Sequence, residues 1–279
     1  MLFSIAMFTL KNAVRPFIPP IVYQGAARLR KTHDQGYAYV PRGWQEAANY
    51  KGWNADTVLA AYQATWPRLV CEAQTTHPLN VVMGSDDATL HNILLCFAYS
   101  LTLAGAGKSI VSFLDWGGAI GQYNLLAQAV LPDTEIDYYC KDVPLLAAYG
   151  QTLHPDAHFM SDENCLERTY DFVLASSSLQ YSEDWQEILT KLARAARGYF
   201  LLTRCPVHDE GASYVFSQSA YGSEWLGWSF NRNQILNCVA DAGLILVREF
   251  VMSNSTIPIT NAPCPSQQRG FLFRRKEAA

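Results

Sequence analysis

The feature that most constrains the fold is a regular alternation of short apolar runs with helical patterns from residue 110 onward. Strands are expected at 110–114, 135–141, 157–160, 171–175 and 198–203. Helices are expected at 122–130, 145–153, 183–196 and 231–242. Two last strands, at 244–251 and 270–274, flank a Pro-rich loop and are expected to form an antiparallel pair at the sheet edge. Repeated βα units with short connections predict an α/β fold with a doubly wound, mostly parallel, seven-stranded sheet.

The sequence before residue 110 differs from this pattern in composition and in hydrophobic periodicity. Residues 16–54 are rich in Pro, Gly and aromatic residues and are expected to form an irregular arm that wraps the core. Apolar periodicity predicts helices at 55–72 and 86–104. We therefore divide the chain into an N-terminal helical extension, residues 1–84, and a main α/β domain, residues 85–279.

Charge and cysteine content narrow the class of protein. Lys and Arg number 21 against 25 Asp and Glu, a net charge of −4, whereas a general nucleic-acid binder would carry a basic stripe. The seven cysteines are odd in number, widely scattered and without a C-x-x-C pair. This disfavours a disulfide framework or a structural zinc site and predicts a reducing, cytoplasmic location.

The first residues raise the question of a membrane. Residues 1–10 are apolar, but Lys11 and Arg15 interrupt the run, which is too short to span a bilayer. Its charges follow the apolar run, unlike those of a signal peptide. Residues 1–15 are expected either to dock on the protein's own surface or to lie on the inner face of the membrane, helped by the basic residues at 28–31.

A glycine-rich turn follows the first strand of the α/β pattern. A dinucleotide-binding turn needs G-x-G-x-x-G, but counting from Gly117 places Ala119 and Gln122 at the second and third positions. A pyrophosphate-binding turn, and with it an NAD-dependent nucleotide-sugar enzyme, is therefore disfavoured. The pattern present is D-x-G-G-A-x-G, with Asp115 two residues before Gly117 and Gly121 four residues after it.

This turn resembles the first motif of class I S-adenosylmethionine-dependent methyltransferases, [D/E]-x-G-x-G-x-G. Asp115, Gly117 and Gly121 match, Ala119 stands where the middle glycine is usual, and Gly118 still supplies backbone freedom. The segments 113–123, 43–47 and 175–181 also resemble a bacterial group of methyltransferases associated with surface-polysaccharide biosynthesis. The resemblance implies the Rossmann-like methyltransferase fold and S-adenosylmethionine as cofactor.

The second and third strands of the pattern are each followed by acids. Asp142 can accept hydrogen bonds from both ribose hydroxyls, or cap the next helix; the two roles can coexist. By the family pattern, Asp162 contacts the adenine amino group, with Glu163 as the near alternative; Ser161 or Asp162 could equally cap a helix. Small residues at 176–178 leave room for the sulfonium. The predicted cofactor-binding residues are Asp115, Gly117, Gly118, Ala119, Gly121, Asp142, Asp162 and Ser176.

The predicted acceptor is a small molecule or glycan, through a hydroxyl of a sugar or lipid-linked glycan intermediate; this rests on the resemblance. An aromatic stretch at 204–230 lies where the class places substrate-binding insertions, and aromatic rings stack on sugars. Alternatively, the stretch packs on the N-terminal arm as ordinary core. The predicted substrate-side residues are Gln180, Tyr181, Tyr221 and Trp225.

Methyl transfer to a hydroxyl benefits from a base that takes its proton. His208 is the candidate base, with His91 as a weaker option, and a structural role for His208 is the alternative. Residues 176–181 contain no carboxylate cluster, so no metal is expected. A non-catalytic binding protein that keeps the fold stands as the second hypothesis.

Overall fold

The computed structural model describes residues 36–75 and 88–276. Tyr37–Ala279 separate from Met1–Gly36 as a unit of their own, and the account below concerns that unit. The expected surface or membrane contact of residues 1–15 lies outside the described residues. So does the predicted domain boundary after residue 84.

A single sheet of ten strands, counted over the described residues, organises the fold. Seven strands follow the predicted pattern: β2 (Ile110–Trp116), β3 (Glu135–Lys141), β4 (His158–Met160), β5 (Tyr170–Ser176), β6 (Ala196–His208), β9 (Leu244–Ile257) and β10 (Ser266–Arg275). They lie in the order β4-β3-β2-β5-β6-β10-β9, in which the first five are parallel and β10 is antiparallel to both its neighbours. The predicted doubly wound, mostly parallel sheet and its closing antiparallel pair are confirmed.

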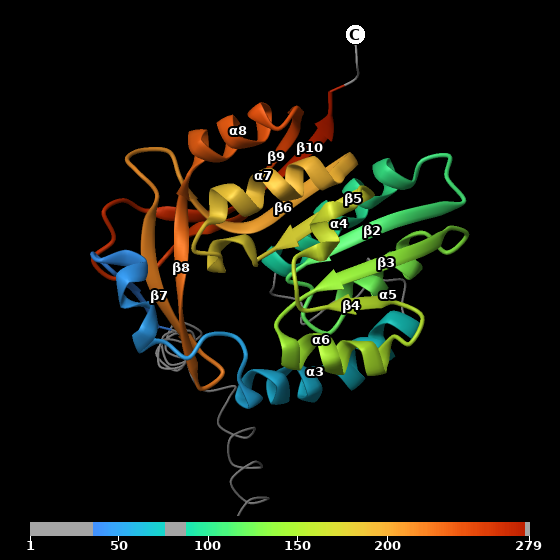
Figure 1. Ribbon diagram of the computed structural model, residues 1–279, viewed down its shortest axis with the longest axis horizontal. Coiled ribbons are helices and arrows are strands. Elements are labelled where there is room, and N and C mark those ends of the chain that lie inside the picture. The colour runs from blue at the N-terminus through green and yellow to red at the C-terminus, as the bar shows by residue number, and fades with distance from the viewer. Residues whose placement is uncertain (1–35, 76–87, 277–279) are drawn as a thin grey trace, which may run out of the picture. The chain divides into compact units, whose positions relative to one another are not determined.

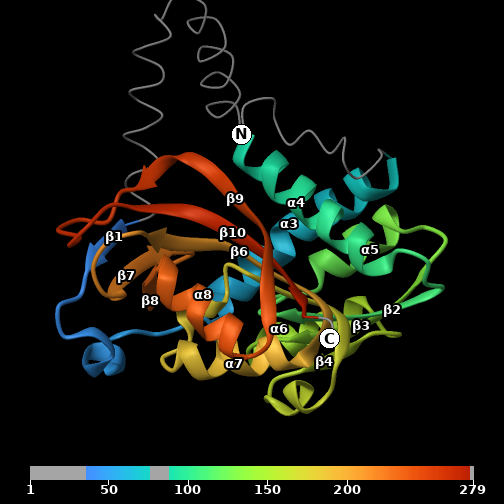
Figure 2. The same cartoon turned by 90° about the horizontal axis from the view of Figure 1, so that it is seen from above.

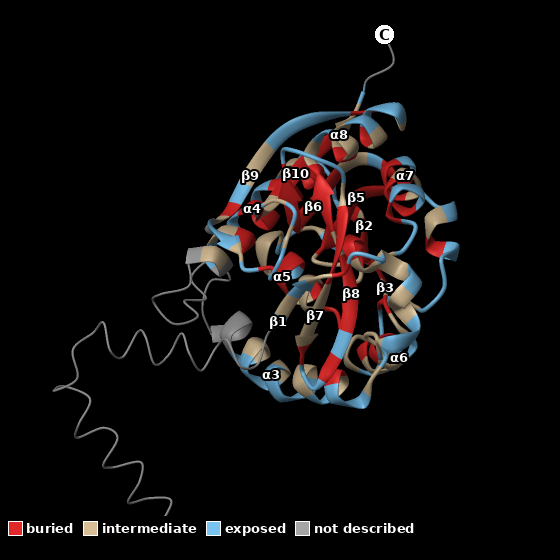
Figure 3. Ribbon diagram, turned by 90° about the vertical axis from the view of Figure 1, so that its left-hand side faces the viewer, coloured by how far each residue is buried: buried red, intermediate tan, exposed pale blue. Residues whose placement is uncertain are grey.

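Helices cover both faces of this sheet (Figures 1 and 2). On one face, α7 (Trp185–Ala195) packs onto β5 and β6, with Leu189 and Leu192 fully buried, and α8 (Arg232–Asp241) packs against α7 and β9. On the other, α4 (Ala88–Gly105) packs onto β2 and β5 through Phe97 and Leu101, and α5 (Gln122–Val130) packs beside it against β3. Each such side chain contributes about 2 kcal/mol by leaving water. The central strands are accordingly the most buried part of the unit (Figure 3).

The aromatic stretch at 204–230 is not a loop. β6 continues to His208 instead of ending at residue 203, and β7 (Tyr214–Ala220) and β8 (Ser223–Asn231) follow as an antiparallel hairpin. Tyr221 and Gly222 connect them with φ of 52° and 68°, the backbone of a two-residue type I′ hairpin turn. With β1 (Gly36–Tyr39), this hairpin brings the sheet to ten strands.

The strand order reverses direction at one point in the sheet, beside β2. From β2 the chain proceeds outward through β3 and β4, then returns to the other side of β2 with β5 and β6. Ligands of open α/β sheets bind outside the carboxyl ends of the strands at such a reversal. The carboxyl ends of β2 and β5 are therefore where a site is expected. Helices α3 (Asp56–Thr75) and α6 (Pro144–Leu153) contact each other near this edge.

Candidate functional site

The turn after β2 lies at this reversal and has the backbone that its glycines predict. Gly117 and Gly121 have φ of 73° and 91°, and Ala119 has φ of 52°. The Gly117 amide donates to the Lys141 carbonyl at the end of β3 (2.7 Å). The departure from the family motif at Ala119 is thus a non-glycine residue in a left-handed conformation, which costs about 1 kcal/mol.

Two of the glycines are required by space, and Gly117 is required by its backbone angle as well. A Cβ added at Gly117 would lie 2.2 Å from the Cβ of Ser178, at the carboxyl end of β5. A Cβ added at Gly118 would lie 2.4 Å from Oδ2 of Asp115. The turn is therefore pressed against both strands between which the sheet reverses.

Asp115 lies beneath the turn and is fully buried. The Tyr138 hydroxyl donates to Oδ2 (2.6 Å), while Oδ1 has no hydrogen-bond partner. Burial raises the pKa of Asp115 to about 7; the Tyr138 hydrogen bond opposes the rise and the Asp142 charge adds to it. Asp115 thus supports the turn from inside the protein.

This buried carboxyl gives a pH prediction. Because folding raises the pKa of Asp115 from 3.8 to about 7, its protonated form is favoured in the folded state. The free energy of unfolding should fall as pH rises from about 4 to about 7, by up to about 4 kcal/mol from this group. Asp115→Asn, which stays neutral, should match the wild type in acid and exceed its stability above pH 7.

Urea unfolding of both proteins across this pH range is the measurement. Asp156→Asn, which alters an exposed carboxylate between α6 and β4, is the control and should run parallel to the wild type. An Asp115→Asn profile parallel to that of the wild type would refute the raised pKa.

Asp142 joins the end of β3 to the turn. Its Oδ2 accepts the Ala119 amide and its Oδ1 accepts the Val143 amide, each at 2.7 Å. Burial raises its pKa, although both hydrogen bonds oppose the rise. Val143 occupies the N-cap position of α6 with no side-chain cap, so Asp142 is not the cap of that helix.

The other two predicted cofactor residues lie in different surroundings. Asp162 is exposed after β4, and its Oδ1 accepts the Asn164 amide (3.0 Å) at the start of the short helix Asn164–Glu167. Ser176 is buried at the end of β5, with its hydroxyl 2.9 Å from that of Tyr123 on α5. Ser176 therefore lies at the sheet reversal, whereas Asp162 lies beyond the end of the edge strand β4, which β3 separates from β2.

Four aromatic side chains, which we call the aromatic cluster, pack beside the turn: Trp53, Tyr62, Tyr181 and Trp225. Trp53 stacks on Trp225 with centroids 3.9 Å apart, and Tyr181 meets Trp53 edge-on at 4.9 Å. Gln218 Oε1 accepts hydrogen bonds from Tyr181 (2.8 Å) and Trp225 (3.1 Å). The cluster belongs to one apolar group with Ala119 of the turn, so α3 and the β7–β8 hairpin cover the turn together.

The predicted substrate-side residues fall into two groups. Tyr181, which is half-buried, and Trp225, which is buried, belong to the aromatic cluster. Trp225 has one ring face covered by Trp53, which agrees with the alternative of core packing. Tyr221 is half exposed at the tip of the hairpin. Gln180 donates to Ser177 (3.0 Å), and its Oε1 is buried without a partner.

His208 does not have the surroundings of a base. It is 2% exposed, Nδ1 lies 2.9 Å from the Ser229 hydroxyl, and Nε2 lies 3.2 Å from the Ala212 carbonyl. Its ring also stacks on Tyr214. Burial lowers its pKa. Because both nitrogens are engaged inside the protein, this arrangement supports the structural role, and His208 is not retained as the base. His91 is exposed on α4.

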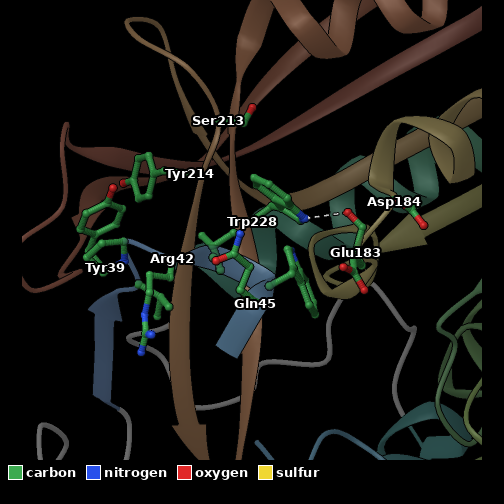
Figure 4. Close-up of a pocket in the computed structure, with 13 residues that line it drawn as sticks. Tyr39, Arg42, Gln45, Glu183, Asp184, Ser213, Tyr214 and Trp228 are labelled. Atoms are coloured by element: carbon green, nitrogen blue, oxygen red, sulfur yellow. Dashed lines mark hydrogen bonds between the residues drawn. The ribbon is translucent and has the colours of Figure 1, made fainter. Parts of the chain in front are cut away.

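A separate groove of about 480 Å³ borders the hairpin (Figure 4). Trp44 and Trp228 line it, with centroids 6.5 Å apart, beside Glu183 and Asp184. The indole of Trp228 donates to the Glu183 carbonyl (3.1 Å), whereas the Trp44 Nε1 is buried without a partner. None of the four residues predicted to contact substrate lines this groove.

Sequence reasoning missed several residues of this region: Trp53, Tyr62, Tyr123 and Arg204. Trp53 and Tyr62 precede the α/β pattern by about 50 residues, and no local spacing ties them to the turn. Their aromatic character inside an amphipathic stretch was the only available signal, and it is equally typical of core.

Two other classes of site have no support in the part of the chain that the structure describes. There, no group of three or more His, Cys, Asp or Glu side chains is placed to hold a metal ion. Within the same residues, no helix has the length and apolarity needed to cross a membrane.

No model of a known protein family matches the sequence, and no curated protein matches it. Among solved structures, the fold is similar to magnesium protoporphyrin IX methyltransferase from Synechocystis PCC 6803 with bound S-adenosylhomocysteine (12% identity, 80% of this chain, 100% of that chain, TM-score 0.45). It is also similar to an S-adenosylmethionine-dependent methyltransferase from Clostridium acetobutylicum (10% identity, 78% of this chain, 100% of that chain, TM-score 0.45). A third similar structure is a sugar N-methyltransferase from Streptoalloteichus (14% identity, 66% of this chain, 87% of that chain, TM-score 0.45). At these TM-scores the likenesses decide nothing about the activity of this chain.

Proposed function

We propose that this protein is an S-adenosylmethionine-dependent methyltransferase that methylates a hydroxyl of a sugar or glycan-type acceptor. The observation that carries the proposal is the Asp115–Gly121 turn at the sheet reversal, tied to the end of β3 by Asp142. The glycine spacing of this turn does not fit a pyrophosphate. The acids after β3 and β4, Asp142 and Asp162, together with the resemblance of the turn, support an adenosine compound without a pyrophosphate as its ligand.

The residues at the turn fit this cofactor. Each Asp142 oxygen accepts one backbone amide and keeps a second lone pair, so the carboxylate can still receive two ribose hydroxyls. The left-handed residues Gly117 and Gly121 shape the backbone that would face the methionine part and the sugar. Asp162, exposed after β4, would contact the adenine. Bound S-adenosylmethionine supplies a methyl group activated by its sulfonium.

The chain's own contribution would be alignment and exclusion of water. Holding acceptor and cofactor in line removes most of the entropic barrier of a displacement with so good a leaving group. The aromatic cluster covers the turn from the side of α3 and the hairpin, which keeps bulk water from the reacting groups. With His208 buried, no described histidine is offered here as the base.

A sugar-type acceptor is supported by the composition of the hairpin region. Trp44 and Trp228 with Glu183 and Asp184 combine ring faces with acids, the pairing that carbohydrate recognition uses. The resemblance to the polysaccharide-associated group points to the same class. The alternative is a protein that binds S-adenosylmethionine without turnover. The methyl-transfer assay described below distinguishes this alternative from the proposed enzyme.

Binding of S-adenosylhomocysteine, measured by calorimetry, tests the cofactor. We expect binding of this compound and none of NAD. Asp142→Ala should weaken the affinity about tenfold or more, because it removes a charged acceptor from the ribose hydroxyls and frees the Ala119 amide. Asp133→Ala, an exposed acid before β3 at the opposite sheet edge, is the matched control and should leave the affinity unchanged.

Transfer of a radiolabelled methyl group to a panel of sugars, sugar nucleotides and glycan lipids tests the enzyme. Binding of the cofactor with no transfer to any acceptor would favour the non-catalytic alternative. Absence of cofactor binding by the wild type, or equal binding by Asp142→Ala, would remove the cofactor assignment or its ribose contact.

A further inference from the structure

Arg204 has an unusual place in β6. Thr203 is the last β6 residue that pairs with β5, opposite Ser176. On the other edge, Cys205 pairs with Arg269 and Leu202 with Phe271, so Thr203 and Arg204 together oppose the single residue between those partners. Arg204 has φ of 58°. This is a β-bulge, the irregularity by which strands redirect a side chain next to a site.

The redirected side chain lies among hydroxyls from three other elements. The Arg204 charge acts on Tyr37 of β1, Tyr62 of α3 and Tyr123 of α5. Burial raises the pKa of each phenol, and the guanidinium opposes the rise. Tyr123 also hydrogen-bonds Ser176 at the end of β5. The guanidinium is thus at the carboxyl edge of the sheet, beside the candidate site.

Among the residues that the structure describes, no carboxylate pairs with this guanidinium. Other arginines of the unit meet carboxylates: Arg197 binds Asp171 and Arg232 binds Glu249, at 2.8 and 2.6 Å. Within the described residues Arg204 has no ion pair, the Tyr123 phenol beside it is neutral because burial raises its pKa, and its own buried Nε has no partner. A half-buried guanidinium with unused donors in a site is suited to a planar or tetrahedral anion.

We propose that Arg204 binds a carboxylate or phosphate group of the acceptor, so that the substrate is an acidic molecule such as a sugar acid or a sugar phosphate. Two anions are candidates for this site, that of the acceptor and the methionine carboxylate of the cofactor. The backbone of β6 lies two strands, or about 10 Å, from that of β2, which carries the glycine turn, and β6 pairs with β8 of the hairpin, on the side proposed for the acceptor. The acceptor side is therefore the assignment. This assignment to the acceptor rests on the proposed function, whereas the anion site itself does not.

The test uses the full chain with Arg204→Gln, Arg204→Lys and, as control for the lost charge, Arg194→Gln on the exposed side of α7. Inorganic phosphate is the probe, and its binding is followed by phosphorus NMR with and without S-adenosylhomocysteine. Arg204→Gln should weaken phosphate binding about tenfold, Arg204→Lys should weaken it less, and the control should match the wild type. Because Arg204 makes no ion pair, thermal unfolding should confirm that all variants are folded.

Cofactor affinity separates the two sources of the anion. S-adenosylhomocysteine and 5′-methylthioadenosine, which lacks the amino-acid part, should each bind Arg204→Gln as they bind the wild type. Loss of about tenfold for the first compound alone would assign Arg204 to the cofactor carboxylate and overturn the proposal. Unchanged phosphate binding in Arg204→Gln would overturn it as well. Phosphate binding through Arg204 in a wild type that does not bind S-adenosylhomocysteine would uphold the anion site and defeat the proposed function.

Discussion

Gly117→Ala is expected to destabilise the fold by about 3 kcal/mol or more and to abolish binding of S-adenosylhomocysteine. The new methyl group would lie 2.2 Å from the Cβ of Ser178. Because the position of a Cβ is fixed by its own backbone, a side-chain rotation cannot relieve this collision and the backbone must move. Ser178 is itself held by its hydroxyl to the Trp116 carbonyl (2.6 Å). The left-handed φ of 73° adds about 1 kcal/mol.

Gly107→Ala is the matched control for this variant. Gly107 has nearly the same φ, 72°, but nothing lies within 4 Å of the added Cβ. Its cost should be about 1 kcal/mol from backbone strain alone, with cofactor affinity retained. The free energies of unfolding of the two variants, measured in urea, separate the cost of backbone strain from the cost of the steric clash with Ser178. Equal destabilisation by both would show that the contact with Ser178 does not constrain the turn.

Asp171→Asn should cost about 3 kcal/mol of stability and leave cofactor affinity unchanged. Asp171 starts β5 and accepts hydrogen bonds from Lys108 (2.7 Å), from Ser112 (2.9 and 3.0 Å) and from Arg197 (2.8 and 2.9 Å). It thereby joins the amino ends of β2, β5 and β6, at the edge opposite the turn. Removing the charge from this half-desolvated cluster breaks several charge-assisted bonds at once.

The loss should depend on pH. Burial alone would raise the pKa of Asp171, but the bonds from Arg197 and Lys108 outweigh it and hold that pKa well below its usual value of 3.8. The stability that Asp171 supplies is therefore present above about pH 4 and is lost in stronger acid. Glu187→Gln, which removes an exposed ion pair with Lys191, is the control and should have no measurable effect. A pH-independent difference between wild type and Asp171→Asn would contradict this account.

The α/β core was predictable because its signals are local. Apolar runs bounded by Gly and Pro place β2 and β3 within two residues, and the turn that follows β2 is fixed by glycines whose φ only glycine adopts easily. Asn231 begins α8 by accepting the amides of Asn233 and Gln234, as a helix N-cap should. These elements are determined by neighbours in the chain.

The hairpin and the bulge were not predictable for the opposite reason. The turn between β7 and β8 places Tyr221 in a left-handed conformation. Asn or Asp at this position would have predicted a type I′ turn, but Tyr does not. Pro206 lies inside β6, and proline normally demotes a strand pattern. His208 resembles a loop histidine in sequence, yet β6 carries it into the core against Ser229. In each case a distant partner decides the outcome.

The β7–β8 hairpin is joined to the parallel part of the sheet by only a short stretch of strand pairing. β6 and β8 pair only at Val207–Phe230 and His208–Asn231. β6 meanwhile has β5 along most of one edge and β10 along the other, so the pairing of these strands does not depend on the hairpin. Residues of β7 and β8 can therefore diverge while the strands that carry the turn stay intact. Related chains are therefore expected to differ most between residues 209 and 230, in the hairpin, and least in the strands that carry the glycine turn.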